Sequence, residues 1–223
     1  MRFFDAVPVR TGRLILAACA QAILATGCAS LQPPAPLPAA DAVTRPALAR
    51  TYQEAIDLTG RLSLRYEQNG APQALDGKFI WSQTAAGAHI DLQTPFGQTL
   101  ATIEVTPQGA TLVQNGQPPR SEPSVDALTA SALGWPLPIA GLRTWLQGFA
   151  TDARGAPYVA SATAIGDDAF VNTADGWLIH YTVWDGAGDA SARARPRRID
   201  LQRLTSQAGN VVLRMVLDTW QPH

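Results

Sequence analysis

Residues that could carry out covalent, metal or acid–base chemistry are few in this chain. Only two cysteines and three histidines occur among 223 residues, which leaves little material for a metal site or a disulfide framework. His89, His180 and His223 are scattered, and none is spaced from another histidine as a metal-binding motif requires. No serine stands in a G-x-S-x-G nucleophile motif. The sequence therefore predicts a binding protein with no catalytic residues, metal or cofactor.

Cys28 is the residue with the clearest prospect of covalent chemistry. Three arginines among the first 13 residues precede an apolar run of roughly 14 residues, which is shorter than the about 20 that span a membrane. The run ends in Leu24-Ala25-Thr26-Gly27-Cys28, and small residues directly before a cysteine resemble a bacterial lipobox. In that motif the cysteine is lipidated and becomes the mature N-terminus. Ala25 departs from the motif, which usually has Leu there, and an ordinary signal peptide that contains a cysteine is the alternative.

The first part of the chain is thus predicted to be a lipoprotein signal peptide over residues 1–27. A lipidated cysteine with a proline-rich tether follows over residues 28–46, and the folded domain spans residues 47–223. Five prolines lie between residues 33 and 46, a density that excludes a helix and favours an extended spacer. A disordered tail would have the same composition. Ala29 follows the cysteine in place of the Asp that retains lipoproteins at the inner membrane of enteric-type bacteria, so we expect an outer-membrane location facing the periplasm.

The charge balance narrows the partners. The chain has 17 Lys+Arg against 18 Asp+Glu, a net charge of −1, and it has no basic run. A nucleic-acid partner, which requires a cationic face, is therefore not expected. The length is sufficient for one domain with a substantial apolar core.

The elements that must position any site are mostly strands. Apolar residues alternate with polar ones over residues 58–67 and 75–81, with the turn signal Asn69-Gly70 between them, and similar patterns continue to residue 220. Helical spacing occurs over residues 47–57, 124–133 and 138–147. These patterns predict an α+β fold with an antiparallel sheet of ten or eleven strands and three helices. Because so many strands must curl or close, an apolar cavity is expected beneath the helices, although a fully packed core is the alternative.

One aromatic residue is placed unusually for a protein in water. Residues 93–98 form a polar turn in which Pro95 and Gly97 set the geometry around Phe96. These neighbours are expected to hold the ring outward, and an exposed Phe at a loop tip is typical of contact with a partner or a membrane. The alternative is that the ring folds back over the edge of the sheet.

Several short motifs, taken in order, resemble the LolB family of outer-membrane lipoprotein receptors of Gram-negative bacteria. Each motif is weak alone, but their order and spacing from residue 58 to residue 220 are specific. They are Leu58-Thr-Gly60-Arg61, Gly77-x-Phe79-x-Trp81, Thr94-Pro95-Phe96-Gly97, Leu133-Gly134-x-Pro136-Leu-Pro138, Leu142-x-x-Trp145-Leu-x-Gly148, Asp175-Gly176-Trp177 with Tyr181, Pro196-x-Arg198-Ile199-x-Leu201 and Asp218-x-Trp220. A segment at Asp185–Arg195 is an insert relative to this pattern.

The resemblance implies a strongly curved, unclosed half-barrel of about eleven antiparallel strands capped by about three helices. Its apolar cavity would receive the acyl chains of lipoproteins from a LolA-like periplasmic carrier and release them into the inner leaflet of the outer membrane. The protruding loop of this family carries an exposed hydrophobic residue, commonly Leu, that is needed for membrane delivery. Phe96 takes that position here, between Pro95 and Gly97. The partners implied are the carrier, lipoprotein acyl chains and outer-membrane lipid, and the chain is expected to act as a monomer.

Candidate cavity residues follow from the inward faces of the strands and from the resemblance, although each could equally belong to an ordinary core. They are Phe79, Trp81, Leu92, Leu142, Trp145, Trp177 and Tyr181. Burying a methylene contributes about 0.8 kcal/mol, so a chain of about 16 carbons contributes on the order of 10 kcal/mol. Periplasmic transfer has no ATP, so a receptor must bind chains more weakly than a bilayer does. Two alternatives are a tethered protein that binds another apolar ligand and a structural envelope protein.

Overall fold

The computed structural model describes residues 50–162, 168–186 and 194–223, all of which belong to one compact unit. Cys28, the signal peptide and the tether lie outside the described residues, as does most of the insert at Asp185–Arg195. In the described part of the chain, twelve strands and two helices are present. They are β1 (Ile56–Gln68), β2 (Ala71–Thr84), β3 (Gly87–Gln93), β4 (Thr99–Thr106), β5 (Gly109–Gln114), β6 (Arg120–Glu122), α1 (Val125–Leu133), α2 (Ile139–Trp145), β7 (Phe149–Thr151), β8 (Pro157–Val159), β9 (Ala169–Asn172), β10 (Leu178–Asp185), β11 (Arg195–Thr205) and β12 (Gly209–Pro222).

Ten of these strands form one antiparallel sheet in the order β6-β5-β4-β3-β2-β1-β12-β11-β10-β9. Within the described residues β6 and β9 are its two edges, so the sheet does not close. The remaining strands, β7 and β8, pair with each other in a small second sheet. The predicted antiparallel, unclosed architecture is therefore confirmed. Because neighbouring strands alternate in direction, the loops that follow β1, β3, β5, β9 and β11 all lie at the same end of the sheet.

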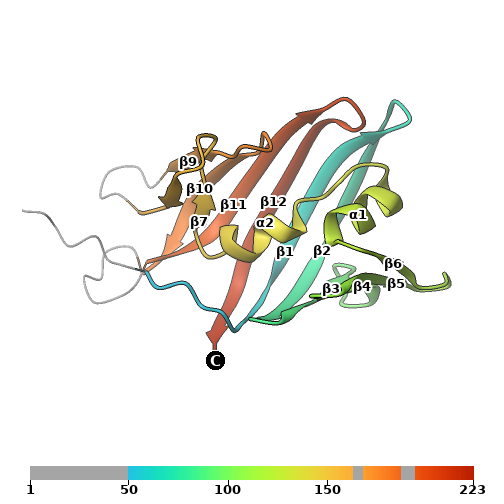
Figure 1. Ribbon diagram of the computed structural model, residues 1–223, viewed down its shortest axis with the longest axis horizontal. Coiled ribbons are helices and arrows are strands. Elements are labelled where there is room, and N and C mark those ends of the chain that lie inside the picture. Colours follow the sequence, from blue (N-terminus) through green and yellow to red (C-terminus); the bar gives the residue numbers. More distant parts are fainter. Residues whose placement is uncertain (1–49, 163–167, 187–193) are drawn as a thin grey trace, which may run out of the picture. The chain divides into compact units, whose positions relative to one another are not determined.

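The helices lie over one face of the large sheet, between β6 and β7 in the chain (Figure 1). Helix α1 begins after Ser124, whose hydroxyl accepts a hydrogen bond from the Ala127 amide, and ends at Gly134 with a positive φ of 84°. Helix α2 packs its Leu142 and Trp145 side chains inward, and both are buried. The residues between the helices, Gly134–Pro138, form the connector.

The third helix, predicted over residues 47–57, is wrong for the part that the structure describes. Residues 50–55 are irregular and β1 begins at Ile56. The reason is tertiary: both backbone polar groups of Gln53 bond the Gln147 side chain, at 2.8 Å for the Gln53 amide and 2.9 Å for its carbonyl. Tyr52 also packs edge-on against Phe149, with ring centroids 5.8 Å apart. These contacts replace the bonds that a helix would have made.

The core lies between the inner face of the sheet and the two helices. Leu58 and Leu64 at even-numbered positions of β1 are buried, whereas Arg61 and Arg65 at odd-numbered positions are exposed. The same alternation places Phe79 and Trp81 of β2 inward. This pattern is typical of an antiparallel sheet with one wet face. It collects apolar side chains of many strands on one side of the sheet.

Candidate functional site

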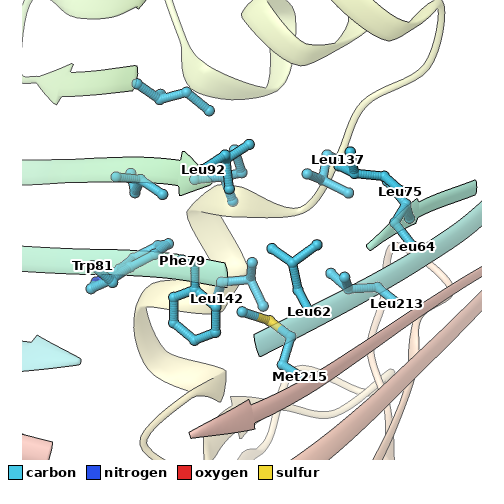
Figure 2. Close-up of a pocket in the computed structure, with 13 residues that line it drawn as sticks. Leu62, Leu64, Leu75, Phe79, Trp81, Leu92, Leu137, Leu142, Leu213 and Met215 are labelled. Atoms are coloured by element: carbon cyan, nitrogen blue, oxygen red, sulfur yellow. The ribbon is translucent and has the colours of Figure 1, made fainter. Parts of the chain in front are cut away.

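An apolar pocket lies between the inner face of the sheet and the segment that runs from the connector into α2 (Figure 2). Its wall comes from β1–β4, β12, the connector and α2, so the sheet curves around it. Every lining side chain is apolar: Leu62, Leu64, Leu75, Phe79, Trp81, Ile90, Leu92, Ile103, Leu137, Ile139, Leu142, Leu213 and Met215. Such a wall offers dispersion contacts and exclusion of water, but no side-chain hydrogen bond.

The pocket is small in this state, with a cavity volume of about 50 Å³. A cavity of this size is too small for an acyl chain of about 16 carbons unless the surrounding side chains rearrange. The pocket is thus apolar and narrow in this state.

The pairing of Gly60 with Phe79 shapes the floor of the pocket. The two residues are opposite each other on β1 and β2, and a Cβ on Gly60 would lie 2.7 Å from the Phe79 ring and 2.2 Å from the Val216 carbonyl oxygen. Glycine at this position therefore lets the ring lie flat against β1. The close approach of Phe79 and Val216 therefore explains why a glycine stands in the Leu58-Thr-Gly60-Arg61 motif.

The indole nitrogen of Trp81 is a polar atom in the pocket wall, and its hydrogen-bond acceptor lies outside the pocket. It donates to the Gln83 side-chain oxygen at 2.9 Å, and Gln83 is itself buried. The Gln83 amide nitrogen is 3.3 Å from the Gln53 carbonyl oxygen, which fixes the orientation of the amide. This relay keeps the indole N–H engaged, so the Trp81 ring presents an apolar face to the pocket.

Helix α2, which forms one wall, is anchored at the edge of the β2–β3 turn. The Arg143 guanidinium donates to the Gly87 carbonyl oxygen at 3.0 Å and also to the Thr84 carbonyl oxygen. Just beyond the same, C-terminal end of the helix, Arg50 donates to the Gly148 carbonyl oxygen at 3.2 Å and to the Ala160 carbonyl oxygen at 2.6 Å. These bonds tie the pocket wall to loops rather than to the inner face of the sheet.

Of the seven candidate cavity residues named from the sequence, the structure places four in the pocket wall and three outside it. Phe79, Trp81, Leu92 and Leu142 line it. Trp145, Trp177 and Tyr181 do not, although all three are buried. Trp145 and Trp177 pack against each other with ring centroids 6.5 Å apart, and Tyr181 packs against Trp184 at 6.0 Å.

The three residues that miss the pocket belong to a second part of the core. Tyr181 lies on β10, two strands beyond β12 in the sheet, and β12 is the outermost strand on that side to contribute to the pocket wall. Burial raises the pKa of Tyr181 above its usual value, so its phenol stays neutral. The missed lining residues, Leu62, Leu64, Leu213 and Met215 among them, share the inward parity of β1 and β12. That parity was visible in the sequence, but the pairing of β1 with β12 was not.

The loop between β3 and β4 carries Phe96 at its tip, where the side chain is 94% exposed. The loop is closed by the Thr94 amide donating to the Gln98 carbonyl oxygen at 2.8 Å and the Gly97 amide donating to the Thr94 carbonyl oxygen at 2.9 Å. Gly97 has a positive φ of 90°, which a side chain would disfavour. The ring does not fold back over the edge of the sheet.

The tip is directly continuous with the pocket wall. Leu92, which lines the pocket, precedes Phe96 by only four residues, a span of at most ~14 Å of extended chain. Leu100, at the start of β4, is also 40% exposed. The exposed apolar tip therefore stands beside one side of the apolar pocket.

Charged groups occupy the opposite, outer face of the sheet. Arg61 pairs with Asp218 at 3.0 Å and Arg65 with Asp76 at 2.9 Å. His89 of β3 contacts Glu104 on the neighbouring strand, and this carboxylate raises the pKa of His89 above 6.5. These pairs keep the outer face soluble and leave the inner face to apolar side chains.

No helix of the described residues is long and apolar enough to cross a membrane. The described part of the chain is an unclosed antiparallel sheet that curves around a wholly apolar pocket, with a hydrophobic loop tip beside it. These features define an unclosed half-barrel with an apolar pocket on its inner face.

Comparison with known proteins assigns the family. The family model described as outer membrane lipoprotein LolB matches residues 54–220. The outer-membrane lipoprotein LolB of Cupriavidus taiwanensis is 37% identical over 215 residues, 96% of this chain and 99% of that protein. Its counterpart in Ralstonia nicotianae is 39% identical over 212 residues, 93% of this chain and 95% of that protein. This chain belongs to the LolB family of outer-membrane lipoproteins, as its motifs predicted, and the predicted outer-membrane location is confirmed.

Proposed function

We propose that this protein receives lipoproteins from a LolA-like periplasmic carrier, holds their acyl chains in the pocket beneath α2, and delivers them to the outer membrane through the Phe96 tip. Membership of the LolB family supports the role of an outer-membrane lipoprotein receptor. The observation that carries the proposal is the adjacency of a wholly apolar pocket and a fully exposed aromatic tip. The absence of a catalytic motif in the sequence agrees with a receptor that is not an enzyme.

The small pocket suits a receptor that must release its cargo. Acyl entry has to displace side chains or the connector, because about 50 Å³ does not hold a chain. The cost of that displacement is subtracted from the gain of about 0.8 kcal/mol per buried methylene. A bilayer requires no such opening. Transfer from the pocket to the membrane is therefore downhill, while water remains the least favourable place for the chains.

Lipidation of Cys28 would hold the protein at the membrane that receives the cargo. The chain enters β1 at Ile56, at the end of the sheet opposite to the Phe96 loop. Residues 28–49 provide up to ~70 Å of contour at about 3.1 Å per residue, against ~43 Å for the 13 residues of β1. The chain is therefore long enough for the tip to reach the same membrane as the anchor.

The test is a two-step transfer assay with the mature chain, residues 28–223, carrying Cys28→Ala. Step one measures movement of a labelled lipoprotein from its carrier to this protein, and step two measures its movement to liposomes. Phe96→Glu is expected to leave step one unchanged and to slow step two by about 10- to 100-fold, because burying a Phe side chain contributes about 1.5–3 kcal/mol.

Val159→Glu is the matched control, since Val159 is 53% exposed but lies in the small second sheet. It should leave both steps unchanged. Normal delivery by Phe96→Glu would refute the role of the tip. If the Cys28→Ala chain that keeps Phe96 does not accept lipoprotein from the carrier, the receptor proposal itself is refuted.

A further inference from the structure

Trp135 has an unusual environment for a buried tryptophan. It lies in the connector between α1 and α2, directly after Gly134, and it is only 2% exposed. Its indole nitrogen is buried and has no hydrogen-bond partner among residues 50–162, 168–186 and 194–223. Buried indole N–H groups usually find an acceptor, and one without an acceptor is destabilising.

The tryptophan that lines the pocket, Trp81, shows that the fold can supply such an acceptor. The Trp81 indole nitrogen donates to Gln83 at 2.9 Å. No comparable side chain reaches Trp135 from the described residues. The two buried indoles therefore differ: the Trp81 N–H has an acceptor, whereas the Trp135 N–H, which has none in the described part of the chain, is free to donate a hydrogen bond.

Trp135 does not line the pocket itself, but its neighbours place it next to one end of the pocket. Its ring packs against Tyr66, with centroids 5.5 Å apart, and Tyr66 is the next inward position on β1 after the lining residue Leu64. Leu137, two residues beyond Trp135, also lines the pocket. Figure 2 shows Leu137 near Leu64 and Leu75 at this end of the pocket.

This end of the pocket is also the side from which a chain can enter. Leu75 and Leu137 at this end, and Leu62 next to it, are partly exposed, whereas Phe79, Trp81, Ile103 and Leu142 are buried. A chain that enters with its methyl end first leaves its opposite end at this side. That end is a carbonyl, joined to the rest of the lipid by an ester or amide bond. A carbonyl oxygen is an acceptor that the apolar lining cannot satisfy.

We propose that the Trp135 indole N–H donates a hydrogen bond to the ester or amide carbonyl oxygen of an acyl chain held in the pocket. The proposal rests on the acyl-binding function proposed above. Entry of a chain displaces Leu137 and its neighbours in the connector, which opens the space between the pocket and Trp135. The bond makes the pocket selective for acyl chains over plain hydrocarbon or ether-linked chains.

The test compares two short-chain lipids that differ only in their carbonyl groups: a dioctanoyl glycerophospholipid with ester linkages and its diether analogue. Affinities are measured with the mature Cys28→Ala chain. The diester is expected to bind about 5- to 10-fold more tightly, the size of one hydrogen bond. Trp135→Phe should reduce this ratio to within about twofold and leave the diether affinity unchanged.

Trp220→Phe is the control, because Trp220 lies near the far end of β12 and outside the pocket wall. It should preserve the ratio. In NMR spectra of the protein, which has six tryptophans, the indole resonance lost in Trp135→Phe should move downfield with the diester and not with the diether.

A ratio near one in the unsubstituted protein, or a ratio that persists in Trp135→Phe, would overturn the proposal and leave the receptor function intact. If neither lipid binds, the acyl pocket itself is wrong, and this proposal fails with it.

Discussion

Removing the Phe79 ring tests whether the pocket is a site for chains or only a packing defect. Phe79 is 1% exposed, lines the pocket and lies flat over Gly60. Large-to-small changes of this kind cost about 3–5 kcal/mol, and the cost rises with the volume of the cavity that remains. Gly60 has no side chain to fill the space and a cavity of about 50 Å³ is already present. We therefore expect Phe79→Ala to lower the free energy of unfolding by about 4–5 kcal/mol.

The same substitution should improve binding of an acyl probe. The enlarged pocket admits more of a chain before the connector has to move, and each further methylene contributes about 0.8 kcal/mol, or roughly fourfold in affinity. A fluorescent fatty acid should bind Phe79→Ala at least about fourfold more tightly than it binds the unsubstituted protein. At 100 times its dissociation constant the probe should restore about 2.7 kcal/mol. Titration by fluorescence and urea unfolding with and without probe measure both effects.

Ile179→Ala is the matched control for this experiment. Ile179 is completely buried on β10 and does not line the pocket, so its loss should cost about 2–5 kcal/mol without any gain in probe affinity. If Phe79→Ala binds no more tightly, or if Ile179→Ala gains as much, the enlarged space is not where the chain goes and the assignment of the pocket fails.

Two further substitutions test local electrostatics and backbone geometry. Because Glu104 raises the pKa of His89 in the folded state, the stability from this pair is present below pH 6.5 and lost as the pH rises through the raised pKa. His89→Gln should remove that decline in urea midpoints, and an unchanged decline would contradict the pairing. Gly148 has a φ of 80° and its Cβ would lie 2.4 Å from the Arg50 guanidinium, so Gly148→Ala should cost about 1–2 kcal/mol more than Gly116→Ala, which meets no neighbour within 4 Å. If thermal unfolding shows the same loss of stability for Gly148→Ala and Gly116→Ala, the Arg50 side chain can move aside without cost and the reasoning is contradicted.

The sequence predicted the sheet better than it predicted the site. Alternation is a local signal, so β1 and β2 were evident from residues 58–81 alone, and the Asn69-Gly70 turn joined them. The pairing of β1 with β12 joins residues about 150 positions apart and has no local signal. That pairing brings Leu213 and Met215 to the pocket. Whether an inward aromatic lines the pocket or fills the second part of the core depends on such long-range pairings.

The Phe96 loop shows the opposite case, in which local chemistry was sufficient. Pro95 restricts the backbone before the tip and Gly97 adopts a positive φ that closes the loop, so the ring has few ways to turn inward. The helix predicted over residues 47–57 failed because its spacing was real but its backbone groups had better partners. Gln147, which provides them, is 94 residues from Gln53.

The position of the moving parts follows from where the strong bonds are. The pocket floor belongs to β1, β2 and β12, which are paired along most of their length, so widening the floor would break many ladder bonds at once. In the connector, the Leu137 amide donates to the Thr129 hydroxyl at 2.9 Å and the Gly134 amide to the Ala130 carbonyl oxygen at 2.9 Å. The contact of the connector with β1 is apolar, the packing of Trp135 against Tyr66. Apolar contacts can be exchanged for contacts with an entering chain at little net cost, whereas ladder bonds cannot. We therefore expect an acyl chain to open the pocket at the connector and to leave by the same side.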